Sequence, residues 1–188
     1  LLLLWDGTRW AWVVLPEFAV ALGTLTSGKP YDVFAFTSTA TPSSTDTGTE
    51  IVTFGSATGW QTGAVVYVDS TFGGLSLATA YWWNAASSTT GSFHTSLADA
   101  LAGASKVNLT ASITANVTAY SLELLVWTND STRATAVTWQ DGRVCKSGDK
   151  TRLLLGTLYT TSTTTAADAD VTRYLANVYN AVPRRLHV

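Results

Sequence analysis

The fold class is decided by residues 134–146, which read Ala-Thr-Ala-Val-Thr-Trp-Gln-Asp-Gly-Arg-Val-Cys-Lys. Residues 134–140 and 143–146 are short runs with β-branched and aromatic side chains, and Asp141-Gly142 lies between them. Such residues favour strands, and an Asp-Gly pair fits the tight turn of a hairpin because both residues tolerate a positive φ. The stretch predicts an antiparallel hairpin in which Asp141 and Gly142 have a structural turn role.

Similar strand signals recur along the rest of the chain. Residues 2–5 and 10–15 flank the turn Asp6-Gly7-Thr8, and residues 18–25 and 31–36 form a second predicted hairpin. Further runs are found at residues 51–54, 64–69, 79–84, 91–94, 106–110, 120–128 and 153–161. Short strands separated by turn residues are typical of antiparallel sandwiches and barrels. The sequence therefore predicts an all-β fold of the antiparallel sandwich or barrel type.

Two short segments are predicted to be helical. Ser96 followed by Asp99 resembles a capping box, which indicates one or two helical turns over residues 96–102. Residues 171–178 place apolar side chains at positions i, i+3, i+4 and i+7, the spacing of an amphipathic helix. Pro183 would end this second segment, so we expect a short C-terminal helix.

The polarity of the chain is carried by hydroxyl groups rather than by charges. Of 188 residues, 49 are Ser or Thr and 8 are Trp, whereas charged residues make up 13% and hydrophobic residues 46%. That much apolar material offsets the entropy cost of ordering a chain, so we expect a folded protein. The net charge of -2 lacks the basic excess that phosphate binding needs, and no apolar stretch is long enough to span a bilayer. Neither a nucleic acid nor a membrane is expected as a partner.

The residues that usually carry chemistry are few and scattered. Cys145 has no second cysteine to pair with, so we expect a buried, inert thiol. His94 and His187 lack ligands at metal-site spacing, and the chain has no phosphate-binding loop and no Gly-x-Ser-x-Gly motif. Most carboxylates stand in turns, where a turn role explains them without the paired carboxylates of glycan hydrolysis. The sequence predicts no catalytic residue, no metal site and no cofactor, and the protein is expected not to be an enzyme.

Aromatic side chains are the strongest candidates for contact with a partner. Tyr81-Trp82-Trp83 is the densest cluster, and Trp60 is a fourth candidate. Because neighbours in a strand point to opposite faces, Trp82 is expected to face away from Tyr81 and Trp83. Three interpretations stay open for these residues: core packing, burial at a subunit contact, and contact with a glycan.

Expectations also follow for the segment that contains Trp127 and Trp139. Both side chains are expected in the core, because each lies in or at the end of an apolar strand. Arg133 follows a turn at residues 128–132 and is expected to brace it by pairing with Asp130. Asp130 and Arg133 are therefore assigned a structural turn role rather than a functional site.

The same segment carries the most specific motif of the chain. Residues 124–135 read Leu-Leu-Val-Trp-Thr-Asn-Asp-Ser-Thr-Arg-Ala-Thr, and they are followed by Gln140-Asp141-Gly142, Lys146-Ser147-Gly148-Asp149, Thr151-Arg152, Leu155-Gly156-Thr157, Arg173-Tyr174-Leu175, Tyr179-Asn180 and Val182-Pro183-Arg184-Arg185. This part resembles the ending of a module in tail-fibre-like and other structural proteins of tailed bacteriophages and prophages. Residues 4–8 and 28–34 resemble the start of the same module. Residues 60–68, 77–83, 91–94 and 98–103 resemble a small β repeat that recurs in phage fibre proteins.

The resemblance implies how the chain is organised. A β module of residues 1–38 and 119–188 would be interrupted by a second small β module at residues 50–118. The Thr- and Ser-rich residues 39–49 are expected to be a linker between them.

The resemblance also implies a function. The protein would be a non-enzymatic structural component on the surface of a phage particle, of the fibre or tail type. It would act as a homo-oligomer, most simply a trimer, together with other virion proteins. Binding of a host surface glycan is a further role that the resemblance implies. A capsid decoration or minor capsid protein is the main alternative, and a glycan-degrading tailspike enzyme is a third.

Overall fold

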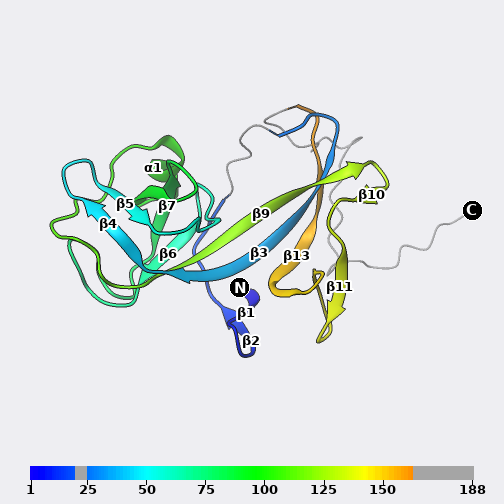
Figure 1. Ribbon diagram of the computed structural model, residues 1–188, viewed down its shortest axis with the longest axis horizontal. Helices are drawn as coiled ribbons and strands as arrows, with labels where there is room; N and C mark the ends of the chain where they lie inside the picture. Colours follow the sequence, from blue (N-terminus) through cyan, green and yellow to red (C-terminus); the bar gives the residue numbers. More distant parts are fainter. Residues whose placement is uncertain (20–24, 163–188) are drawn as a thin grey trace, which may run out of the picture. The chain divides into compact units, whose positions relative to one another are not determined.

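A computed structural model of the chain describes residues 1–19 and 25–162 (Figure 1). The described part is mostly antiparallel β-structure, which confirms the all-β prediction. The predicted C-terminal helix at residues 171–178 lies outside the described residues. The elements are β1 (Leu2–Trp5), β2 (Trp10–Val13), β3 (Pro30–Ala40), β4 (Pro42–Asp46), β5 (Ile51–Phe54), β6 (Val65–Val68), β7 (Tyr81–Ala85), β8 (Thr90–His94), α1 (Leu97–Ala102), β9 (Val117–Asn129), β10 (Thr132–Arg133), β11 (Val137–Gln140), β12 (Arg143–Lys146) and β13 (Asp149–Tyr159).

The described strands form two sheets. β1 and β2 make a two-stranded sheet, and the other eleven strands follow the order β11-β12-β13-β3-β9-β6-β7-β8-β5-β4, with β10 paired to β9 beside this path. Several partners are far apart in the sequence, such as β6 with β9 and β13 with β3. The β13–β3 pair joins the last third of the described chain to the first, and the β6–β9 pair joins its middle to the last third.

The described residues divide into two compact units. Unit 1 contains residues 1–19 and 36–123, and unit 2 contains residues 25–35 and 124–162. The long strands β3 and β9 contribute residues to both units. These boundaries differ from the predicted modules, because the N-terminal hairpin groups with the middle of the chain rather than with its C-terminal part.

Residues 39–49 are not a linker, which corrects the sequence-based prediction. They contain the end of β3, all of β4 and the turn into β5. Asp46 closes this turn by accepting hydrogen bonds from the backbone N–H groups of Gly48 and Thr49, at 2.8 and 3.2 Å. The strands form without large apolar side chains because Thr is β-branched and its hydroxyl bonds across strands, as Thr39 does with Thr118 at 2.8 Å.

The strands of unit 1 surround a core of their own. The path β3-β9-β6-β7-β8-β5-β4 returns to its start, because β4 follows β3 after a single residue, Thr41. This arrangement is barrel-like, in line with the predicted fold type. The inward-facing side chains form one apolar cluster: Phe36, Val52, Phe54, Trp60, Ala64, Val66, Val68, Leu75, Tyr81, Trp83, Phe93, Leu109, Ile113, Ala115, Val117 and Ala119.

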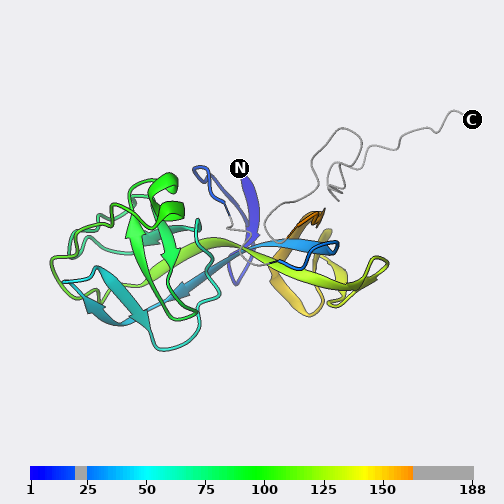
Figure 2. The ribbon, with the colours of Figure 1, turned by 90° about the horizontal axis from the view of Figure 1, so that it is seen from above.

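The helix α1 packs on β7 and β8 in this unit, where Figure 2 shows it in green beside these strands. Ser96 is its N-cap and accepts a hydrogen bond from the backbone N–H of Asp99 at 3.1 Å. The Ser96 hydroxyl donates in turn to the Asp99 carboxylate at 2.6 Å. The helix ends at Gly103, which has a φ of 66°. The capping prediction for residues 96–102 is therefore confirmed.

Unit 2 has a small core of its own. Phe34, Val144 and Leu154 are buried together, and Leu125 and Val137 pack against them. The hairpin from which the fold class was predicted is present, with Gln140 paired to Arg143 across the turn. Its turn residues Asp141 and Gly142 have φ values of 51° and 74°, the left-handed conformation that a two-residue hairpin turn requires. Their predicted turn role is confirmed.

One predicted strand differs from the structure, and another is described only in part. Residues 20–24 of the predicted strand at residues 18–25 lie outside the described residues, and residues 18, 19 and 25 are not in a strand. Residues 106–110 pair only through an isolated bridge between His94 and Lys106. The second segment instead lies against Gly73 and Gly74, where a Cβ on Gly74 would come within 2.1 Å of the Asn108 carbonyl oxygen. Only its first part bonds to a strand, because the backbone N–H of Val107 donates to the carbonyl of Phe93 in β8 at 2.8 Å. Farther along, the N–H of Leu109 donates to the Glu50 carboxylate and that of Thr110 donates to the carbonyl of Gly73.

Candidate functional site

Three of the four aromatic candidates lie in the core of unit 1. Trp60, Tyr81 and Trp83 are only 3%, 5% and 1% exposed, whereas Trp82 is half-buried. Trp82 faces away from its two neighbours, as the strand alternation predicted. For Trp60, Tyr81 and Trp83 the core-packing interpretation therefore holds. The interpretations as glycan or subunit contacts are wrong for these three residues, because this chain encloses their side chains.

These core residues form a chain of perpendicular ring contacts. The ring of Trp60 lies 4.9 Å from Phe54 and 5.5 Å from Trp83, and Trp83 lies 5.4 Å from Phe93. Gly91 provides the room for Trp83, because a Cβ at Gly91 would come within 2.3 Å of its indole ring. Edge-to-face contacts of this kind stabilise a core beyond the apolar area that they bury.

Trp82 is covered in part by the segment that follows β2. Its indole N–H donates to the carbonyl oxygen of Glu17 at 2.8 Å, and the backbone N–H of Ala19 donates to the carbonyl of Gly63 at 3.2 Å. The polar edge of Trp82 is thus satisfied within unit 1, which leaves its ring as the one half-buried member of the predicted set.

Arg133 has a different partner from the predicted one. Its Nε donates to Asp32 at 2.8 Å, and its guanidinium lies 4.6 Å from the centre of the Trp127 ring. Asp130 lies in the turn between β9 and β10, where its predicted turn role holds, but it is not the ion-pair partner of Arg133. The reason is the β9–β10 register, which places Arg133 opposite Trp127 and so directs it away from the turn.

Sequence reasoning missed Asp32, which is 1% exposed. The carboxylate also accepts a hydrogen bond from the Thr157 hydroxyl at 2.7 Å, so both of its oxygens have partners. A carboxylate within the apolar run of residues 31–36 was the available signal. Its partners are 101 and 125 residues away, and no local pattern identifies them.

His94 and Cys145 are both buried. The imidazole of His94 donates from Nδ1 to the carbonyl of Ala104 at 2.6 Å, so Nε2 accepts from the Ser92 hydroxyl at 2.9 Å. Burial lowers the pKa of His94, and the neutral ring satisfies both partners. Burial raises the pKa of the Cys145 thiol, and the charges of Asp149 and Asp141 raise it further. The described residues contain no group of three or more His, Cys, Asp or Glu side chains that could hold a metal ion.

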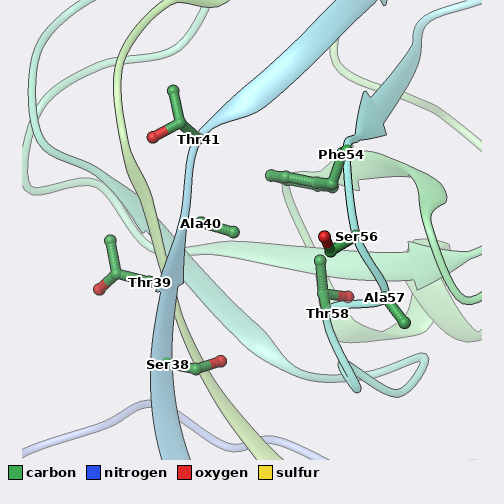
Figure 3. Close-up of a pocket in the computed structure, with 9 residues that line it drawn as sticks. Ser38, Thr39, Ala40, Thr41, Phe54, Ser56, Ala57 and Thr58 are labelled. Carbon is green, nitrogen blue, oxygen red and sulfur yellow. The ribbon is translucent and has the colours of Figure 1, made fainter.

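A groove of about 410 Å³ opens in unit 1 between the end of β3 and the segment that follows β5 (Figure 3). Its lining residues are Ser38, Thr39, Ala40, Thr41, Phe54, Gly55, Ser56, Ala57 and Thr58. None of them is charged, and five carry hydroxyl groups. The groove therefore offers hydrogen-bonding groups and small apolar surfaces but no titratable side chain.

Figure 3 shows how the two walls of this groove face each other. Ser38 and Ala40 point from β3 toward the opposite wall, and Phe54 and Ser56 point back toward β3. Thr39 points away and bonds to Thr118. The strand alternation that directs Ala40 onto the core thus also directs Ser38 into the groove.

Large apolar side chains are exposed on strands of both units. Trp12 is 66% exposed on β2 in unit 1, and Trp139 is 72% exposed on β11 in unit 2. The prediction that Trp139 lies in the core is wrong, although Val144 opposite it on β12 is a core residue. Trp139 lies near the turn on β11, the last strand in the sheet order, which is flanked by a strand on one side alone in the described part of the chain. Trp127 is half-buried under Arg133.

Comparison with known proteins finds no match, neither to a family model, nor to a curated protein, nor to a solved structure. In the described residues, no helix has the length and apolar character needed to cross a membrane.

Proposed function

We propose that this chain is a non-enzymatic structural component of a phage particle, of the fibre or tail type, which acts by assembling with copies of itself and with other virion proteins. The observation that carries the assembly proposal is the exposure of Trp139 on β11. β11 lies at one end of the strand order, so one of its edges has no strand partner in the described part of the chain. An exposed edge that also presents a large aromatic side chain is a natural contact for another protein surface.

The size of the exposed ring supports this role. A tryptophan buries up to about 250 Å² on full burial, so covering the exposed 72% of Trp139 would remove about 180 Å² from water. At about 25 cal/mol per Å², that is worth roughly 4.5 kcal/mol before the costs of association. Tryptophan is also the residue type in which interface energy is often concentrated.

The phage assignment rests on the resemblance of residues 124–135 and the motifs that follow them. Residues 124–135 contain the last part of β9, the turn with Asp130, and β10, and all of them belong to the unit that presents Trp139. We propose a trimer on the basis of the same resemblance. Closed symmetry would cover the β11 edges of all copies equally. The alternative is a capsid decoration protein, which would assemble through the same β11 contact on the head of the particle.

Immunogold electron microscopy of intact particles tests the proposal. Particles are prepared from a host that carries the gene, and an antibody against the purified chain is used to label them. Gold on fibres or tails is the expected result, and gold on heads would favour the capsid alternative. Particles that stay unlabelled, while the same antibody labels the purified chain, would contradict a virion role. Antibody pre-absorbed with the purified chain is the control.

A further inference from the structure

The groove of unit 1 lies where its barrel-like wall is left open. β4 and β5 are paired from Asp46 with Ile51 as far as Pro42 with Phe54. Beyond Phe54 the chain leaves the strand, and no hydrogen bond joins residues 38–41 to residues 55–58 among the described residues. The opening is therefore part of the fold, set by where the β4–β5 pairing stops.

One buried residue fixes a hydroxyl on each wall of the groove. The indole N–H of Trp60 donates to the Ser38 hydroxyl at 2.7 Å, and the backbone N–H of Trp60 donates to the Thr58 hydroxyl at 3.2 Å. Trp60 itself is held between Phe54 and Trp83 in the core. Because each hydroxyl already accepts one hydrogen bond, its own proton remains available for donation to a ligand.

The remaining lining complements these two hydroxyls. Ser56 is exposed and points across the groove from the wall opposite Ser38. Ala40 and the edge of Phe54 add small apolar surfaces between the hydroxyls. A ligand in the groove would therefore meet alternating hydroxyl and carbon groups, a pattern that a sugar ring also presents.

The absence of charge from the nine lining residues selects against charged ligands. Moving an ionised group out of water costs free energy that only an opposite charge or several strong hydrogen bonds offset. Binding a neutral polyhydroxylated ligand costs less desolvation free energy, because each of its hydroxyls exchanges a water partner for a protein hydroxyl. The volume of about 410 Å³ is at the lower end of the range for small-molecule pockets.

From these observations we infer that the groove is a binding site for a neutral carbohydrate of one or two sugar units. Ser38, Ser56 and Thr58 bind the sugar hydroxyls, and Trp60 is a positioning residue that orients two of them. The site lies within unit 1 of a single chain, so it does not depend on assembly. A failure to bind sugar would leave the proposed structural role standing, and a failure to assemble would leave the groove intact.

The test is a titration of the full ¹⁵N-labelled chain followed by two-dimensional amide NMR. The probes are methyl glucoside, methyl galactoside, N-acetylglucosamine and maltose, with glucuronic acid and glucosamine as charged counterparts. At least one neutral sugar is expected to shift the amide signals of residues 38–41 and 55–58 along a saturable curve. A few hydrogen bonds to an open groove correspond to a dissociation constant on the order of 1–10 mM. The charged counterpart should bind at least about fivefold more weakly.

A matched pair of substitutions and a third substitution locate the site. Ser56→Ala removes an exposed hydroxyl from the groove and should weaken binding by about three- to tenfold, which corresponds to one hydrogen bond. Ser112→Ala makes the same change at an exposed position outside the lining and should leave the affinity unchanged. Trp60→Phe keeps an aromatic ring but removes the donor to Ser38, so it should weaken binding while the spectrum stays that of a folded protein.

Several results would overturn the inference. One is the absence of shifts at the groove amides with every neutral sugar at about 100 mM, well above the expected dissociation constant. Another is equal affinity in the Ser56→Ala and Ser112→Ala variants, or tighter binding of the charged sugars. An extended neutral peptide that shifts the same amides when the sugars do not would assign the groove to a different class of ligand.

Discussion

Arg133→Met is the substitution that probes unit 2 most sharply. It removes the guanidinium that pairs with Asp32 at 2.8 Å and keeps a flexible apolar side chain over Trp127. The carboxylate of Asp32 is 2% exposed, so water cannot replace the lost partner easily. Thr157 would remain as its one described hydrogen-bond donor.

The expected cost follows from this asymmetry in burial. Breaking a fully buried ion pair costs about 3–5 kcal/mol, because one charge is left buried without compensation. The Arg133 side chain is 33% exposed, so solvent screens part of the pair, and we expect about 2–3 kcal/mol. Asp32→Asn in the Arg133→Met background removes the stranded charge and should recover more than half of this loss.

Urea unfolding followed by tryptophan fluorescence measures these free energies. Lys150→Met is the control in the same unit, because the Lys150–Asp141 pair is 38% and 51% exposed and should contribute about 0.5 kcal/mol. An Arg133→Met variant no less stable than Lys150→Met would refute a large contribution from the buried pair. A further loss of stability when Asp32→Asn is added to Arg133→Met would also contradict it.

Three further predictions concern packing, pH and thiol chemistry. Gly91→Ala should lower the free energy of unfolding by about 2–4 kcal/mol or prevent folding, because the new methyl group overlaps Trp83. Gly55→Ala is the control, because its Cβ has open space around it and the melting temperature should change little. Because the pKa of His94 is lowered below its ordinary value of 6.5, its contribution to stability should be complete above pH 6.5 and decline as the pH falls toward the folded-state pKa. The decline should not exceed about 1.4 kcal/mol per pH unit, and a pH dependence unchanged in His94→Gln would contradict it. Cys145 is 0% exposed with a raised pKa, so a thiol reagent should label it slowly in the native protein and at once in denaturant; equal rates would show that the thiol is accessible.

The features predicted well from the sequence are those that local residues determine. The Asp141-Gly142 turn needs only two residues that tolerate a positive φ, and both adopt one. The cap of α1 needs only Ser96 and Asp99, three residues apart. The opposite facing of Trp82 and Trp83 follows from the geometry of any strand.

The features that were predicted poorly depend on partners far away in the chain. Arg133 pairs with Asp32 rather than with nearby Asp130, because strand register decides which side chains meet. Residues 39–49 form strand because their hydroxyls find partners on β9 and β5, and the composition alone resembles a linker. The groove was not predicted at all, since its walls meet only when β4 and β5 pair.

Light scattering on the purified full chain, across a range of concentrations, tests the central claim most directly. Assembly through β11 predicts a discrete oligomer whose mass is a small multiple of 20.0 kDa. Trp139→Ser should shift this oligomer toward the monomer by removing about 180 Å² of contact from each copy. Thr138→Ser, a conservative change at an exposed neighbour on β11, should leave the oligomer intact. A protein that stays monomeric at every concentration, or an oligomer that Trp139→Ser does not weaken, would contradict assembly through this edge.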